Sequence, residues 1–151
     1  MDDETFIAAF ETQAFPLEEW HHREHIKIAY LYLLRYPPDE ALKRIRAGIQ
    51  ALNSSHKVPD ALDRGYHETM TVAWMRLVHC ALSESGPAET ADAFVDKHTQ
   101  LSSKRAVLFF YSRDRIMSPE AKREFVEPDI AQLPKVRLRA QDEQSAAADR
   151  L

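Results

Sequence analysis

The sequence predicts an all-α fold, a compact single-domain bundle of five to seven helices. Three observations support this prediction. Apolar residues recur three and four positions apart in one segment after another, which is the period of an α-helix. The chain holds only three glycines, too few for a turn-rich β sandwich or barrel. At 151 residues it has the length of one domain. A chain of this length can bury roughly two thirds of its unfolded surface, so it needs no disulfides or structural metals to fold.

The first helix is expected over residues 3–14. Its apolar face carries Phe6, Ile7 and Phe10, and acidic residues at its start suit the helix dipole. Phe15-Pro16 ends it, because the residue before a proline is forced out of the α region. The second, central helix is expected to begin within the stretch Glu18 to His21 and to end near Tyr36. Its apolar stripe is the widest in the chain and comprises Ile26, Ala29, Tyr30, Leu33 and Leu34.

Pro37-Pro38 separates the central helix from a third one, expected over about 38–53. The link is short, which favours an antiparallel hairpin of these two helices. A loop follows over 54–64, and Gly65 precedes a fourth helix from about Tyr66 to Ser83. The buried face of the fourth helix is expected to hold Met70, Ala73, Trp74, Leu77, Val78 and Ala81.

The elements expected after the fourth helix are shorter. Ser85-Gly86-Pro87 is the clearest break, and a fifth helix is expected over 88–101. A sixth is expected near Lys104 to Tyr111, with the aromatic run at its end in the core, and a seventh from Ser118 to about Val126. The helical domain is therefore assigned to residues 1–135. Residues 136–151 are charged and Ala/Ser-rich without apolar periodicity, which predicts a disordered tail.

Composition excludes several classes of function. The net charge of −4 gives no basic field for nucleic acid, so no nucleic-acid partner is expected. The longest apolar run is too short to span a bilayer, so no membrane partner is expected either. The opening MDDETF lacks the basic region of a signal peptide, which predicts a cytoplasmic protein. A homo-oligomer is compatible with this composition.

Two histidines at the start of the central helix are the first candidates for chemistry. His22 and His25 are three residues apart, so on a helix they lie about 60° apart and roughly 4.5 Å along the axis. Histidine is the commonest metal ligand, and a metal needs ligands on rigid elements. His21 with His25 is an alternative pair. Such pairs also occur as helix caps or as core residues, and that interpretation stays open.

A second polar cluster opens the fourth helix. His67 is expected to point into the apolar layer at its polar end, and Glu68 either turns toward the same pocket or serves as an ordinary acid of the first turn. If the two helix starts converge, His22, His25 and His67 form a metal-binding set for iron, zinc or copper. Glu68 is then a fourth ligand or the general base beside a metal-bound water. A metal-free acid/base pocket and a purely structural cluster remain alternatives.

Five further residues are secondary candidates. Tyr66 belongs to the second cluster, and Thr71 shares the face of His67. His56 follows Asn53 in the loop and closes over the site or lies on the surface. Arg113 brings a guanidinium group that binds a carboxylate or phosphate, or else caps a helix.

Three segments carry a family resemblance. WHHREHIKIAYLYLLRYP, RAGIQALN and GYHETMTVAW resemble an uncharacterised family of small bacterial all-helical proteins with the motifs W-x-H-x-x-H and G-Y-H-E-T. The resemblance covers roughly residues 15–130 and leaves out the tail. It points to His22, His25, His67 and Glu68, and it implies no particular activity.

Together these features favour a metal-dependent enzyme acting on a small organic molecule, with oxygenase-type and hydrolytic chemistry both open. The alternative is a non-catalytic helical protein that binds a ligand or a partner and whose polar cluster is structural. The two differ in whether the purified protein contains a metal.

Overall fold

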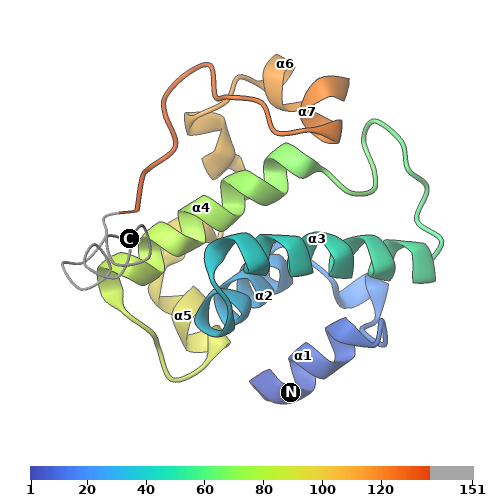
Figure 1. Ribbon diagram of the computed structural model, residues 1–151, viewed down its shortest axis with the longest axis vertical. Coiled ribbons are helices and arrows are strands. Elements are labelled where there is room, and N and C mark those ends of the chain that lie inside the picture. Colours follow the sequence, from blue (N-terminus) through green and yellow to red (C-terminus); the bar gives the residue numbers. More distant parts are fainter. Residues whose placement is uncertain (137–151) are drawn as a thin grey trace, which may run out of the picture.

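The computed structural model describes residues 1–136 and confirms an all-α, single-domain bundle. This part of the chain forms seven α-helices and three short 3-10 helices, and its one β-bridge is isolated (Figure 1). The disordered tail expected at 136–151 lies, apart from Val136, outside the described residues. The elements are α1 (Asp3–Glu11), η1 (Leu17–Glu19), α2 (His22–Arg35), α3 (Pro38–Ser55), α4 (Glu68–Ser85), α5 (Ala91–Lys97), η2 (Thr99–Leu101), η3 (Lys104–Phe109), α6 (Arg113–Ile116) and α7 (Pro119–Arg123).

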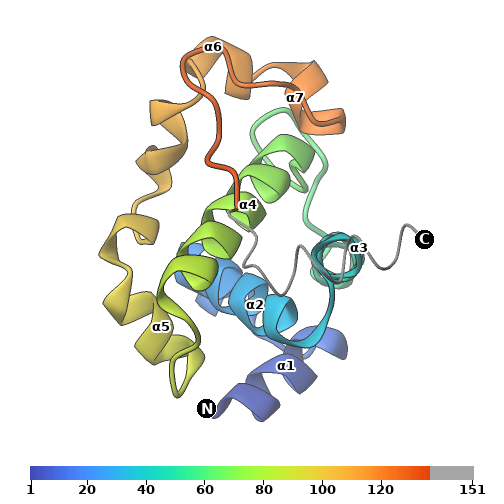
Figure 2. The same cartoon turned by 60° about the vertical axis from the view of Figure 1, so that its left-hand side comes forward.

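The bundle is built around α2, as the width of its apolar stripe predicted. Seven consecutive residues from Ile26 to Tyr32 are buried, and α2 packs against α3, α4 and α5 (Figure 2). The stripe ends earlier than expected. Leu33 is only partly buried, and Leu34, with 47% of its surface exposed, was wrongly assigned to the core. Leu34 lies on the last turn, beyond the seven buried residues, where the neighbouring helices no longer enclose the helix.

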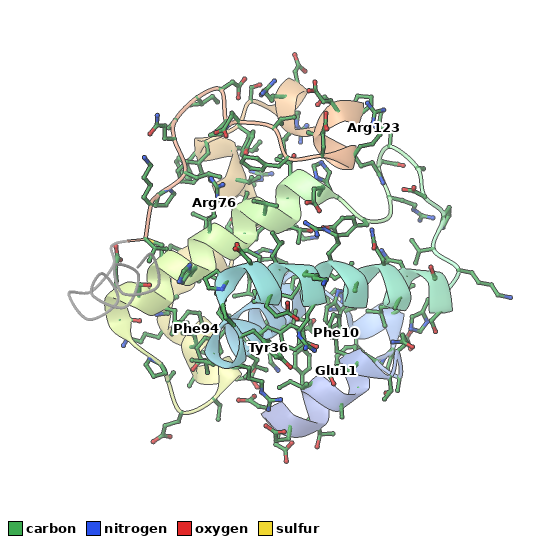
Figure 3. All side chains as sticks on the ribbon, in the orientation of Figure 1. Phe10, Glu11, Tyr36, Arg76, Phe94 and Arg123 are labelled. Atoms are coloured by element: carbon green, nitrogen blue, oxygen red, sulfur yellow. The ribbon has the colours of Figure 1, made fainter. Side chains whose placement is uncertain are left out.

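Aromatic rings fill the space between α1, α2 and α3. The Trp20 ring stacks on Phe6 and Phe10 and meets Phe15 edge-on, with centroid distances of 5.2–6.0 Å. Figure 3 shows Phe10 close to α3. At Gly48 of α3, an added Cβ would lie 2.3 Å from two carbons of the Phe10 ring. Glycine is therefore required at this point of α3, because any side chain would displace the ring.

Helix α4 separates two hydrophobic clusters. Met75, Val78 and Ala81 belong to the main core with α1, α2, α3 and α5. Ala73 faces a smaller cluster with Tyr111 and the segments around α6 and α7. Figure 1 accordingly shows α4 between α2 and α3 on one side and α6 and α7 on the other. Because α4 has a partner on both sides, its first turn is held in a fixed position relative to the start of α2.

The later elements differ in detail from the expectation. The fifth helix is shorter, Ala91–Lys97, and η2 completes the predicted range. The sixth is the 3-10 helix η3, and α6 was not predicted. Within the run assigned to the core, Tyr111 is buried and its hydroxyl donates to the Val126 carbonyl oxygen at 2.7 Å. The assignment of Phe109 was wrong, since 74% of its surface is exposed. A 3-10 helix turns about 120° per residue, so neighbouring residues point to different sides.

None of the helices in residues 1–136 is both long enough and apolar enough to cross a membrane.

Candidate functional site

A cavity of about 440 Å³ lies where α2 and α4 begin. Its wall draws on α2, α3, α4, the loop before α4, η3, the residue that follows α6, and α7. It is lined by Trp20, His21, His22, His25, Ala29, Ile45, Ile49, Asn53, Leu62, Asp63, Arg64, Gly65, Tyr66, His67, Met70, Thr71, Trp74, Met75, Lys104, Met117 and Lys122. The starts of the second and fourth helices thus face one cavity, and His22, His25 and His67 all line it.

The proton of His25 is placed by its partner. The Trp20 indole Nε1–H donates to His25 Nε2 at 3.0 Å. An indole nitrogen can only donate, so Nε2 of His25 carries the lone pair and Nδ1 carries the proton. Burial, and then the charges of His22 and Lys104, lower the pKa of His25 to about 4. This imidazole is therefore neutral at pH 7, with an N–H donor at Nδ1.

His22 has the opposite arrangement. Its Nε2 lies 2.7 Å from the Leu101 carbonyl oxygen, which only accepts, so Nε2 carries the proton and Nδ1 the lone pair. The Trp74 ring packs against the imidazole at a centroid distance of 4.4 Å. Burial and the charge of Lys104 lower the pKa of His22, although the bond to Leu101 works against them. The cavity wall thus holds one neutral imidazole with a free acceptor beside one with a free donor.

These two Nδ1 atoms are open to a ligand. Among residues 1–136, neither has a hydrogen-bond partner. The same residues hold no fully buried side-chain nitrogen or oxygen that lacks a partner. An unpartnered Nδ1 must therefore have accessible surface, and the cavity is the space that both side chains line.

His67 uses both ring nitrogens inside the protein. It is the N-cap of α4, where its Nδ1 accepts from the Met70 backbone N–H at 3.0 Å. This cap explains why α4 begins at Glu68 rather than at Tyr66. The opposite nitrogen, Nε2, donates to the Ile116 carbonyl oxygen at 2.8 Å. Burial lowers the pKa of His67, so it is a neutral cap that joins α4 to α6.

Glu68 points away from the histidines. It lines a neighbouring, more open cavity, where Arg46 donates to both carboxylate oxygens at 2.8 and 2.6 Å and the Tyr66 hydroxyl donates to one of them. Burial alone would raise the pKa of Glu68, but the bonds from Arg46 and Tyr66 hold it below its usual value. Burial, followed by Glu68, raises the pKa of Tyr66 to about 12. This geometry suits an ionised structural carboxylate better than a general base.

The residues do not fit a metal centre in this arrangement. Within residues 1–136, no group of three or more His, Cys, Asp or Glu side chains is placed to hold a metal ion. The lone pair of His25 is taken by Trp20, and that of His67 by the Met70 N–H. The metal roles of His22, His25 and His67, and the general-base role of Glu68, stay predictions.

The secondary candidates divide into two groups. Asn53, Tyr66 and Thr71 line the cavity, and Asn53 and Tyr66 also line the neighbouring one. His56 ends α3, with its Nε2 2.9 Å from the Phe15 carbonyl oxygen, and lines neither. Arg113 is exposed at the start of α6 and also lines neither.

Several lining residues were not predicted. Both tryptophans of the chain line the cavity, as do three of its four methionines, Met70, Met75 and Met117. Apolar periodicity assigned Trp74 and Met70 to the core, because a cavity wall and a packed core have the same sequence pattern. Trp20 is the first residue of the W-x-H-x-x-H motif, but no place in the cavity wall was predicted for it. Lys104 also lines the cavity and comes from a distant segment, so nothing in the sequence linked it to the histidines.

Comparisons of the chain with protein-family models, with curated proteins and with solved structures found no match. The resemblance to a family of small helical proteins therefore stays a prediction, and the function is argued from the geometry of the cavity.

Proposed function

We propose that this protein binds a small, largely apolar organic molecule in the cavity at the starts of α2 and α4. The observation that carries the proposal is the pair of neutral imidazoles in one apolar wall, His22 with a free acceptor and His25 with a free donor. Ligand cavities typically measure about 300–1,000 Å³ and combine apolar walls with a few placed polar groups. The cavity of about 440 Å³ has this character.

The apolar wall suits a compact ring or short chain. Trp74 offers an aromatic surface, and Ile45 and Ile49 an aliphatic one. The three lining methionines have flexible, polarisable side chains that adapt to the shape of a ligand. The polar groups of the ligand then meet His22 and His25, whose ring orientations are fixed by Leu101 and Trp20.

Intrinsic fluorescence tests the proposal directly, because the only two tryptophans line the cavity. The probe is trans-4-pentylcyclohexanecarboxamide, a compact apolar molecule that does not absorb near 280 nm. We expect a saturable change in tryptophan emission and a raised melting temperature, since a ligand that binds only the folded state stabilises it.

A matched pair of variants locates the binding. Ala29→Phe adds a ring to the cavity wall and should weaken binding at least tenfold, whereas Ala47→Phe makes the same change on the exposed face of α3 and should have no effect. Melting curves of both variants confirm that they are folded. Equal binding by the two variants would show that the probe binds elsewhere and would refute the proposal.

A metal-dependent enzyme acting on a small organic molecule is a second candidate, with oxygenase-type or hydrolytic chemistry. It is favoured by one observation, the free Nδ1 lone pair of His22 beside His25 on the next turn of α2. Catalytic zinc sites usually have three protein ligands, so His25 would have to give up its bond from Trp20, and His67 or Glu68 would have to exchange its present partners for the metal.

Elemental analysis separates the two candidates. Protein purified without a histidine tag, and reconstituted anaerobically with iron, zinc or copper, is compared with His22→Ala and with His79→Ala, which changes a histidine outside the cavity. Stoichiometric metal in the wild type and in His79→Ala, with loss in His22→Ala, would favour the enzyme. A wild-type protein without metal would rule out the metal-dependent enzyme and leave ligand binding as the remaining candidate.

A further inference from the structure

We infer that the cavity selects an anionic ligand, a small apolar molecule carrying a carboxylate, and that Lys104 binds its charge. This inference rests on the proposed ligand-binding function and names the class of ligand. Two features of the described residues support it, the balance of charge around the cavity and the position of Lys104.

The wall of the cavity is positive although the chain is negative. Its lining includes three cationic side chains, Arg64, Lys104 and Lys122, against one acidic side chain, Asp63, whereas the whole chain carries a net charge of −4. Lys122 forms an ion pair with Asp60, which leaves an excess of one positive charge. A cleft lined by one sign of charge attracts ligands of the opposite sign.

Lys104 is the cation best placed to hold the ligand. It is the first residue of η3, lines the cavity, and has no ion-pair partner among residues 1–136. His22 bonds the carbonyl oxygen of Leu101, three residues before Lys104, which puts the start of η3 beside the two imidazoles, and the charge of Lys104 lowers the pKa of both. A carboxylate there can take the N–H of His25 and the ammonium of Lys104 together.

The other two cations are less suitable. Lys122 is held by Asp60 and by the Tyr66 carbonyl oxygen at 2.8 Å, so its ammonium is already engaged. Arg64 belongs to the loop between α3 and α4 and follows Asp63, which also lines the cavity and whose charge opposes its own. Neither acts on the two histidines as Lys104 does.

Two isosteric probes test the inference. trans-4-Pentylcyclohexanecarboxylate and its primary amide have the same shape and differ in charge. Both are titrated by tryptophan fluorescence against the wild type, Lys104→Met, Lys104→Arg and Lys97→Met, the last being a lysine that lines neither cavity. We expect the wild type to prefer the carboxylate roughly tenfold, which corresponds to about 1.4 kcal/mol. Lys104→Met should reduce this preference to less than about twofold while amide binding stays unchanged.

The control variants and the salt dependence test whether the charge of Lys104 causes the preference for the carboxylate. Lys104→Arg and Lys97→Met should keep the preference, and raising the salt concentration should weaken carboxylate binding more than amide binding, because salt screens exposed charges. Equal binding of both probes to the wild type, or a preference that survives in Lys104→Met, would overturn the inference and leave the proposed function standing. Failure of both probes to bind would overturn the proposed function as well.

Discussion

The half-buried imidazole of His25 should make the fold sensitive to mild acid. Its pKa is about 4 in the folded protein, against 6.5 for an ordinary histidine, and the cause is chiefly burial. Between these values the unfolded chain binds a proton that the folded chain does not. Stability is therefore fully present above pH 6.5 and falls as the pH decreases toward 4. At about pH 4.5 the loss due to His25 alone is roughly 2–3 kcal/mol.

His25→Gln isolates this contribution. Glutamine still offers an acceptor to the Trp20 indole but does not titrate, so the variant should lose less stability than the wild type on going from pH 7 to about 4.5. The assay is urea unfolding followed by circular dichroism at several pH values. Carboxylates that titrate in this range affect both proteins equally and cancel in the difference. His21→Gln, at a side chain that is 71% exposed, is the matched control and should follow the wild type.

If the free energies of unfolding of the wild type and His25→Gln stay parallel from pH 7 to about 4.5, His25 is not held neutral by burial. An NMR titration of the His25 ring protons gives an independent reading, and a folded-state pKa near 6.5 would contradict the same reasoning.

Three further changes test the packing. Gly48→Ala should cost about 1–3 kcal/mol because the new Cβ meets the Phe10 ring, and urea unfolding measures it. Arg46→Met should cost about 1–3 kcal/mol, because the half-buried Glu68 carboxylate loses its bidentate partner. Thr69→Val should cost about 1–3 kcal/mol, since the buried hydroxyl bonds both the Glu124 carbonyl oxygen and the Val126 N–H. Thermal melts rank the last two against the wild type.

Each of these changes has its own control. In a Phe10→Leu background the cost of Gly48→Ala should shrink, and an unchanged cost would show that the ring is not the obstacle. Adding Glu68→Gln to Arg46→Met should recover stability, and additive losses would contradict a coupled pair. Thr69→Ser keeps the hydroxyl and should stay close to the wild type. A serine variant as unstable as Thr69→Val would mean that the methyl group matters more than the hydrogen bonds.

The sequence was sufficient for the class of fold and for where the long helices lie. Periodicity located α2, α3 and α4 closely, because long apolar stripes and proline breaks determine them. The convergence of the starts of the second and fourth helices was a hypothesis from their polar clusters, and residues of both starts line one cavity. Periodicity failed in the later elements, where short 3-10 turns carry no stripe, as the exposed side chain of Phe109 illustrates.

The candidate site was only partly predictable, for a physical reason. Spacing along a helix tells which residues share a face, but it does not tell which hydrogen-bond partners a side chain finds across the fold. The bonds of His67 to Ile116 and of Glu68 to Arg46 join positions 49 and 22 residues apart. These partners determine which ring nitrogen can still bind a ligand and which carboxylate is already held in an ion pair. The chemistry of the cavity could therefore be derived only from the packed structure.

The central claim is that the cavity between the starts of α2 and α4 binds a small apolar molecule. Its most direct test is a ¹H–¹⁵N NMR titration of the wild type with trans-4-pentylcyclohexanecarboxylate. The account predicts saturable shifts of both indole N–H signals, Trp20 and Trp74, together with the backbone signals of His25, Thr71 and Lys104. Shifts confined to residues outside the cavity wall, or no shift at a millimolar concentration of the carboxylate, would contradict it.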